Sequence, residues 1–213
     1  MIETIVVVSD ELVGTGGFFA IRRFSLRNRR TDGSLSAPYN NDAVVRPIGQ
    51  DAVVVAIFTR TAGAIRVLVR DGLRPTVHLT RDPAVAPLPE PAPGMFVTEL
   101  VAGILEVGDS LAHRAAEEIR EEAGFVVDPS RVVVLGAGML GSPGPLAEKE
   151  YFCAVEVDPA TQLAELPTDG SPMEEGATTR WLDLDDAIAR CVRGDICDMK
   201  TEIGLRRLRD HLA

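Results

Sequence analysis

The amino-acid sequence predicts an α/β (α+β) fold, with a mixed β-sheet sandwiched between helices and a small β-unit at the N-terminus. Strand-like and helix-like segments follow one another in the order strands, helix, strands, helices, which is typical of a sheet covered by helices. With 213 residues, of which 46% are hydrophobic, the chain can bury a full core without disulfides. We expect the N-terminal β-unit to span residues 1–47 and the main domain to span residues 48–213.

The expected strands are runs rich in Val, Ile, Leu and Phe that end near Gly, Asp or Asn. They are residues 4–8, 18–28, 51–60, 64–71, 96–103, 131–140 and 150–157. The connections are a glycine-rich turn at 14–17, a loop at 31–42 and a hairpin turn at 61–63. Residues 82–94, with five prolines, are predicted to be an extended loop, either a plain surface insertion or a lid over a site.

The composition argues against several classes of function. A formal net charge of −10 without a basic stripe argues against nucleic acid and anionic membranes as partners. The three cysteines and three histidines lack metal-ligand spacings, so we expect reduced thiols and no zinc site. The N-terminus has no secretory pattern, and no apolar run has the length of a membrane span, so the protein is expected in the cytoplasm.

One long helix is expected from about Leu111 to Ala123, where Gly124 suits the position after its end. Two shorter helices are expected after a strand end, within residues 181–212. At about 100° per residue, the long helix has an apolar flank and a carboxylate flank, with Glu118 and Glu122 at the seam between them.

The glutamates of this helix require a compensating partner. Like charges three and four residues apart repel each other, and a half-buried carboxylate is costly to desolvate. Water or a metal ion would compensate, and a solvated acidic helix face is the plainer alternative. Clustered oxygen ligands without His or Cys suit Mg²⁺ or Mn²⁺.

The segment around the helix resembles the Nudix box. Five residues separate Gly103 from Asp109, seven more precede Glu117, and residues 117–125 read EEIREEAGF. The family motif is Gly, five residues, Glu, seven residues, then Arg-Glu-apolar-x-Glu-Glu-x-Gly-apolar. The spacing is intact, and two of the nine specified positions differ, Asp109 for Glu and Glu117 for Arg.

The resemblance extends from about residue 50 to residue 208, to the ADP-ribose and nucleotide-sugar pyrophosphatase branch of the Nudix family. Similar segments are LVRDGLRP (68–75), ELVAG (99–103), SPG (142–144) with Glu148, EEG (174–176), WLDLDDA (181–187) and GDICDMKTEIGL (194–205). The resemblance implies the Nudix fold, Mg²⁺ as cofactor with Mn²⁺ as a substitute, and a homodimer formed through the N-terminal β-unit.

Position by position, the resemblance implies roles for individual residues. The metal ligands would be the carbonyl of Ala102 and the carboxylates of Glu118, Glu121, Glu122 and Glu175. The base that activates water would be Glu175, with Glu174 as its close rival, and Glu122 would share in catalysis. The substrate or its pocket would be contacted by Arg74, Glu99, Gly103 and Ser142, although a solvated strand-end arginine is the alternative for Arg74.

Glu117 stands where the family has an arginine that pairs with nearby carboxylates. Arg120 points away from the carboxylate flank, whereas Arg114 lies three residues before Glu117 and four before Glu118. We therefore expect Arg114 to take over the pairing, and Arg114 and Asp109 to stabilise the box.

The resemblance implies a Mg²⁺-dependent pyrophosphatase that cleaves a nucleoside diphosphate sugar to a nucleoside monophosphate and a sugar phosphate. ADP-ribose and ADP-, UDP- or GDP-sugars are all candidates, and the DMKT segment (198–201) slightly favours hexose nucleotides. The alternative is a Nudix-fold module that binds nucleotide without turnover, which Glu117 favours and the retained box glutamates oppose. An acidic interaction domain without any ligand is the third reading.

Overall fold

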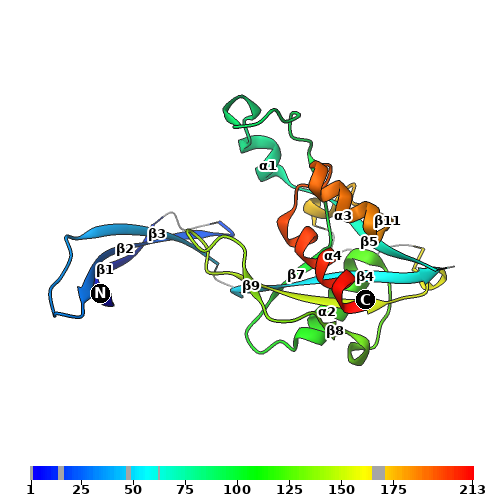
Figure 1. Cartoon of the computed structure of the whole chain (residues 1–213), viewed down its shortest axis with the longest axis horizontal. Coiled ribbons are helices and arrows are strands. Elements are labelled where there is room, and N and C mark those ends of the chain that lie inside the picture. Colours follow the sequence, from blue (N-terminus) through cyan, green and yellow to red (C-terminus); the bar gives the residue numbers. More distant parts are fainter. Residues whose placement is uncertain (1, 14–16, 47–48, 62, 165–170) are drawn as a thin grey trace.

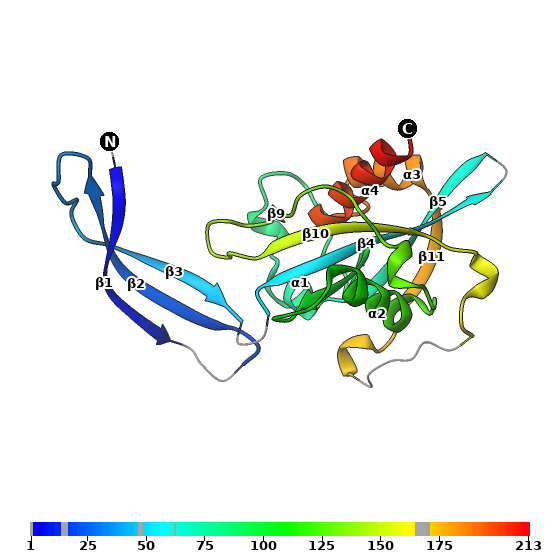
Figure 2. The same ribbon diagram turned by 90° about the horizontal axis from the view of Figure 1, so that it is seen from below.

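The computed structural model describes residues 2–13, 17–46, 49–61, 63–164 and 171–213. These residues form two sheets. A three-stranded antiparallel sheet, made of β1 (Ile2–Val13), β2 (Ala20–Arg30) and β3 (Tyr39–Val45), projects from the main body in both views (Figures 1 and 2). The main body is a mixed sheet with helices on both faces, which confirms the predicted α/β fold.

The main sheet has the strand order β11-β5-β4-β10-β8, and the remaining strands pair beside this path. Its strands are β4 (Asp51–Thr61), β5 (Ala64–Leu73), β6 (Phe96–Glu99), β7 (Val101–Leu105), β8 (Val133–Val134), β9 (Met139–Leu140), β10 (Lys149–Glu156) and β11 (Thr178–Asp183). Strands β4 and β5 form the predicted antiparallel hairpin, and β10 lies parallel to β4. The central strand β4 is buried on both faces, which explains its nearly continuous run of apolar residues.

Helix α2 (Leu111–Ala123) covers one face of the sheet, and α3 (Leu184–Arg193) and α4 (Met199–Leu212) cover the other (Figure 2). Alternate residues of β4 pack into two hydrophobic cores, one on each face of the sheet. Val53 packs in the core beneath α2, which includes Ile119, and Val54 packs in the core that includes Leu205 of α4. The amphipathic pattern that was expected for residues 111–123 therefore matches the face that α2 buries, and the two helices expected within residues 181–212 are present as α3 and α4.

The other helices lie in loops. They are α1 (Pro75–Thr80) and the 3₁₀-helices η1 (Pro83–Val85), η2 (Pro129–Arg131), η3 (Pro159–Thr161) and η4 (Pro172–Glu174). The sequence analysis did not predict α1, which has a proline at its start and buries none of its residues. The predicted proline-rich loop is confirmed, apart from η1. None of the helices in the described ranges is both long and apolar enough to cross a lipid bilayer.

Several predicted boundaries are wrong. Strand β1 extends over Ile2–Val13 instead of 4–8, and β2 lies two residues later than expected. Residues 39–42 were expected in a loop but begin β3, because an exposed edge strand tolerates the polar residues of YNND. The strand expected at 96–103 is interrupted at Leu100, where the chain changes partner from β5 to β4. The strand expected at 131–140 is reduced to β8 and β9, and Gly136 between them has a positive φ of 87°. Residues 14–16 of the predicted turn and the expected domain boundary at 47–48 lie outside the described residues.

Candidate functional site

A cavity of about 800 Å³ opens beside α2, between β7, η4 and the base of the N-terminal sheet. It brings together residues that are far apart in the sequence. Its lining includes Phe18, Phe19, Arg46, Arg74, Ala102, Gly103, Arg114, Glu118, Glu121, Glu122, Glu148, Glu150, Glu174 and Lys200.

Glu118 faces the backbone of β7 at Gly103. The apolar flank of α2 packs on the sheet, so Glu118 at the edge of that flank is only 5% exposed. A Cβ atom at position 103 would lie 1.6 Å from Glu118 Oε1, which is an impossible approach. Gly103 is therefore required because it leaves room for the carboxylate of Glu118.

Glu122 lies one turn further along α2 and also faces β7. Its Oε2 accepts a hydrogen bond of 3.1 Å from the backbone N–H of Ala102, and its Oε1 lies 3.3 Å from Arg70 Nη1. Burial and the charge of Glu122 raise the pKa of Glu118 to about 7. Burial also raises the pKa of Glu122 to about 7, although Arg70 opposes this shift. The cations of the protein itself thus compensate these two carboxylates poorly.

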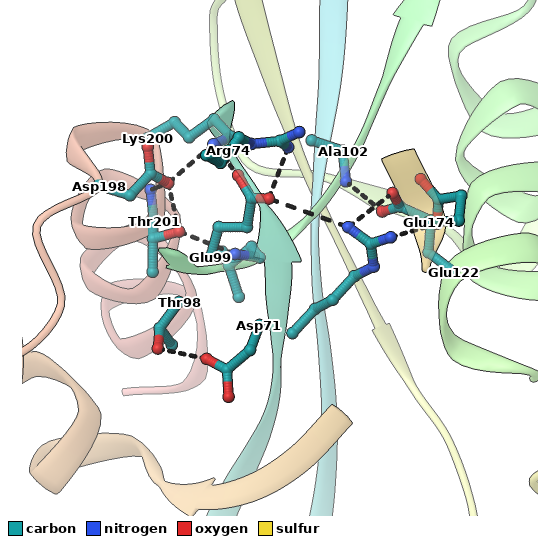
Figure 3. Close-up of polar contacts among 12 residues, drawn as sticks. Asp71, Arg74, Thr98, Glu99, Ala102, Glu122, Glu174, Asp198, Lys200 and Thr201 are labelled. Carbon is teal, nitrogen blue, oxygen red and sulfur yellow. Dashed lines mark hydrogen bonds and ion pairs between the residues drawn. The ribbon is translucent and has the colours of Figure 1, made fainter. Parts of the chain in front are cut away.

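Arg70 on β5 is a site residue that the sequence analysis missed. Its side chain is 2% exposed and lies among three carboxylates. It forms ion pairs with Glu122 and Glu174, and its Nη1 is 3.9 Å from Glu99 Oε1; Figure 3 shows these three carboxylates. A charged residue within the apolar run IRVLVRD of a central strand was the signal in the sequence.

Glu99 is the centre of a second ionic cluster (Figure 3). It is 1% exposed, and its Oε1 lies 2.5 Å from Arg74 Nη2 while its Oε2 lies 2.8 Å from Lys200 Nζ. Lys200 also lies 2.9 Å from Asp198 Oδ2. Burial would lower the pKa of Lys200, but the carboxylates of Glu99 and Asp198 outweigh this effect and raise it.

Arg114 contacts both Glu117 and Glu118, the glutamates with which it was expected to pair. Its guanidinium forms an ion pair with Glu118 and lies 3.1 Å from Glu117 Oε2. Arg120 instead contacts its neighbour Glu121 at 3.1 Å on the exposed side of the helix. Arg114 thus supplies, from one turn earlier, a cation like the one that the family motif has at position 117. The role of Arg114 in stabilising the box stays a prediction.

The structure distinguishes between the two candidate loop glutamates. Glu174 lines the cavity and pairs with Arg70, whereas Glu175 is exposed and is not among the described residues that line the cavity. Ser142 and Asp109 are likewise exposed and outside the described lining. Asp109 accepts a hydrogen bond of 2.8 Å from the backbone N–H of Glu106, so it holds the loop before α2.

The carboxylates that line the cavity are candidate ligands for a divalent cation. Within the described ranges, no three His, Cys, Asp or Glu side chains are gathered closely enough to hold a metal ion. Glu118 and Glu122 nevertheless present hard oxygen donors side by side, with raised pKa values that a nearby cation would relieve. The chemistry of these residues therefore fits Mg²⁺, provided that the contact between Arg114 and Glu118 loosens.

Two aromatic side chains also line the cavity. Phe18 and Phe19 lie just before β2 and contact each other edge to face, with ring centroids 4.7 Å apart. Both rings are exposed, and Arg46, which pairs with Glu148, also lines the cavity. The cavity thus joins an exposed aromatic surface to a wall of carboxylates and cations.

No protein-family model matches the chain. The curated ADP-ribose pyrophosphatases of Escherichia coli K12 and of Shigella flexneri are each 28% identical to it over 145 residues. These alignments cover 68% of this chain, and the chain spans 60% of the length of those relatives. A crystal structure of an ADP compounds hydrolase superposes with a TM-score of 0.67 at 13% identity, covering 100% of this chain and 96% of that chain. This superposition shows that the two share a fold.

Proposed function

We propose, from the homology of this chain to ADP-ribose pyrophosphatases of the Nudix family, that it is a hydrolase of nucleoside diphosphate sugars. It would cleave the pyrophosphate bond to release a nucleoside monophosphate and a sugar phosphate. The observation that carries the proposal is the pair Glu118 and Glu122, which face the backbone at Ala102 and Gly103 inside a cavity of about 800 Å³.

The metal requirement follows from the charges in the cavity. Glu118 and Glu122, with the carbonyl of Ala102, would hold a Mg²⁺ ion, and Glu121 would contribute at the rim. When bound, the ion would neutralise the charge of the diphosphate and lower the pKa of a bound water. Without it, the glutamates of α2 would repel the phosphates.

Glu174 is the better candidate for the carboxylate that accepts a proton from water. It lines the cavity and shares Arg70 with Glu122, so it is held close to the proposed metal ligands. Glu175 is exposed and would need the loop to move before it could reach the same place. A positioned carboxylate of this kind typically contributes about 10²–10⁴-fold to the rate.

The two ends of the cavity suit the two ends of the substrate. Exposed Phe18 and Phe19 offer a surface on which a nucleobase can stack. Arg74 also lines the cavity, with a side chain that is 40% exposed, so it can contact the diphosphate. A nucleoside diphosphate linked to a sugar would therefore lie with its base towards the N-terminal sheet.

We also propose that the N-terminal sheet, within residues 1–47, pairs two copies of the chain into a homodimer. The sheet projects from the body and exposes apolar side chains that include Val7, Val8, Ile21 and Leu35. Such a surface is typical of an interface. Light scattering coupled to size-exclusion chromatography would test this, since a monomer at micromolar concentration contradicts the proposal.

The enzymatic proposal is tested with a panel of nucleotide sugars, including ADP-ribose and ADP-, UDP- and GDP-hexoses. Release of nucleoside monophosphate is measured with Mg²⁺ and with a chelator, for the wild type and for Glu122→Gln. Mg²⁺-dependent release that the variant loses would support the proposal. Tight binding of a panel member without turnover at any divalent ion would instead favour a nucleotide-binding module.

A further inference from the structure

Lys200 belongs to the first turn of α4, and its side chain reaches towards Glu99 at the candidate site (Figure 3). It is one of two lysines in the chain, and its side chain is 18% exposed. Its ammonium lies 2.8 Å from Glu99 Oε2 and 2.9 Å from Asp198 Oδ2. Lys200 also lines the cavity, so it connects the buried carboxylate of Glu99 to the substrate side.

Contacts from both sides fix this position. Asp198 caps α4 by accepting hydrogen bonds from the backbone N–H of Thr201 at 3.0 Å and from its hydroxyl at 2.6 Å. The same hydroxyl accepts a hydrogen bond of 2.8 Å from the backbone N–H of Leu100, next to Glu99. These hydrogen bonds tie the start of α4 to the chain next to Glu99, and they therefore hold the ammonium of Lys200 beside that carboxylate.

Glu99 depends on its counter-ions. At 1% exposure its charge is cut off from water, and a buried carboxylate without a partner is strongly destabilising. Lys200 donates a hydrogen bond to Glu99 Oε2, whereas among the described residues no donor reaches Oε1 with hydrogen-bond geometry. Arg74 lies 2.5 Å from Oε1 as an ion pair, and Arg70 is more distant at 3.9 Å.

Arg74 differs from the other two cations in its exposure. Its side chain is 40% exposed and lines the cavity, whereas Arg70 is 2% exposed and is shared with Glu122 and Glu174. Arg74 is therefore the cation that can turn towards a diphosphate. When it does, Glu99 loses its closer ion pair at Oε1 and retains the hydrogen bond from Lys200 and the longer ion pair with Arg70.

We infer that Lys200 is a positioning residue that compensates the charge of Glu99 and so leaves Arg74 available to bind the diphosphate of the substrate. The inference rests on the proposed function, because it assigns Lys200 to the same site. Without Lys200, Glu99 would compete with the diphosphate for Arg74. A neutral side chain at position 200 should therefore weaken diphosphate binding, even though it does not touch the reacting bond.

The first test measures ADP binding by calorimetry in the presence of Mg²⁺. Lys200→Met is expected to weaken ADP about tenfold, which corresponds to about 1.4 kcal/mol. Lys149→Met is the matched control, because Lys149 is exposed on β10 and outside the described lining of the cavity. Lys200→Arg keeps the charge and should restore most of the affinity. Equal affinities for Lys200→Met and Lys149→Met would overturn the inference.

A second test separates positioning from a merely structural role. Adding Glu99→Gln to Lys200→Met removes the competing charge, so ADP affinity should return to within about threefold of the wild type. In this double variant position 99 carries no charge that needs a counter-ion, so the variant serves if Lys200→Met alone does not fold. In the Arg74→Ala background, Lys200→Met should weaken ADP less than about twofold further. Two outcomes would overturn the inference. One is an ADP affinity that stays low in Glu99→Gln/Lys200→Met. The other is a full further tenfold loss when Lys200→Met is added to Arg74→Ala.

Turnover gives the third readout. Lys200→Met should raise the KM for the best nucleotide sugar about tenfold while kcat changes less than about threefold. A loss confined to kcat would overturn the inference. ADP binding that depends on Lys200 in a protein without any turnover would support it and would overturn only the proposed function. A wild-type protein that binds none of ADP, UDP and GDP would overturn both.

Discussion

Arg114 and Glu118 form an ion pair one turn apart within α2, and Arg114 also reaches the exposed Glu117. Because Glu118 is 5% exposed, its charge in the metal-free protein relies on this arginine. Because Glu118 is also a candidate metal ligand, the ion pair links the stability of the protein to whether a metal ion is bound.

Replacing Arg114 by Ala should lower the free energy of unfolding of the metal-free protein by about 1–3 kcal/mol, because a buried carboxylate loses its cation. Urea unfolding in the presence of a chelator measures this loss. Arg120→Ala on the same helix is the control, since its contact with Glu121 is exposed and should contribute less than about 1 kcal/mol. Equal losses in the two variants, or unchanged Mg²⁺ affinity and turnover in Arg114→Ala, would contradict a role for Arg114 in the box.

The stability of the metal-free protein should fall as the pH rises from about 4.5 to about 7. The pKa of Glu118 and of Glu122 is raised from 4.5 to about 7 by burial. In this window the folded state holds protons that the unfolded chain has released, so the stabilisation present below pH 4.5 is lost by about pH 7. Thermal unfolding across this range, with a chelator, measures the slope.

Mg²⁺ should reverse that trend, because the carboxylates bind the ion in their ionised form. The increase in Tm on adding Mg²⁺ is expected to grow as the pH rises. Glu118→Gln/Glu122→Gln is the control and should flatten both dependences. An unchanged slope in that variant would assign the pH dependence to other groups.

Gly103→Ala should displace Glu118, because the new Cβ would lie 1.6 Å from its Oε1. We expect a destabilisation of about 1–3 kcal/mol, as is typical when a packed site is overfilled. The increase in Tm on adding Mg²⁺ should also be lost. Gly144→Ala is the matched control, since a Cβ there meets no atom within 4 Å. Wild-type behaviour of Gly103→Ala would show that β7 can shift to accommodate the side chain.

Glu174→Gln should lower kcat for the best substrate about 10²-fold, because Glu174 lines the cavity and shares Arg70 with Glu122. Glu175→Gln should change kcat less than about threefold, since Glu175 is exposed. Steady-state kinetics of the two variants decides between them. The reverse order would mean that the loop rearranges when substrate binds, which would restore the role first expected for Glu175.

Local patterns were sufficient to predict the element that carries the candidate site. The sequence of residues 111–123 predicted the approximate limits of α2 and its apolar flank, with Glu118 at the edge of that flank, and Gly124 ends the helix with a φ of 72°. Helical periodicity is a property of consecutive residues, so it can be read without knowledge of the rest of the fold.

The ion pairs around the candidate metal ligands could not be predicted in the same way. Lys200 and Glu99 are 101 residues apart, and Arg70 and Glu174 are 104 residues apart. Their contacts depend on how α4, β5 and η4 pack around β6, which no local pattern specifies. The polar start of β3 was missed for a related reason, because an edge strand takes its conformation from its partner β2.

The placement of Arg114 bears on how such a site can be recognised in a sequence. Arg114 pairs with glutamates three and four residues further along the same helix, so one ion pair can be built from more than one arrangement of residues. A search that requires a cation at position 117 would miss this arrangement. A search that asks for any cation on the helix face of Glu118 would find it.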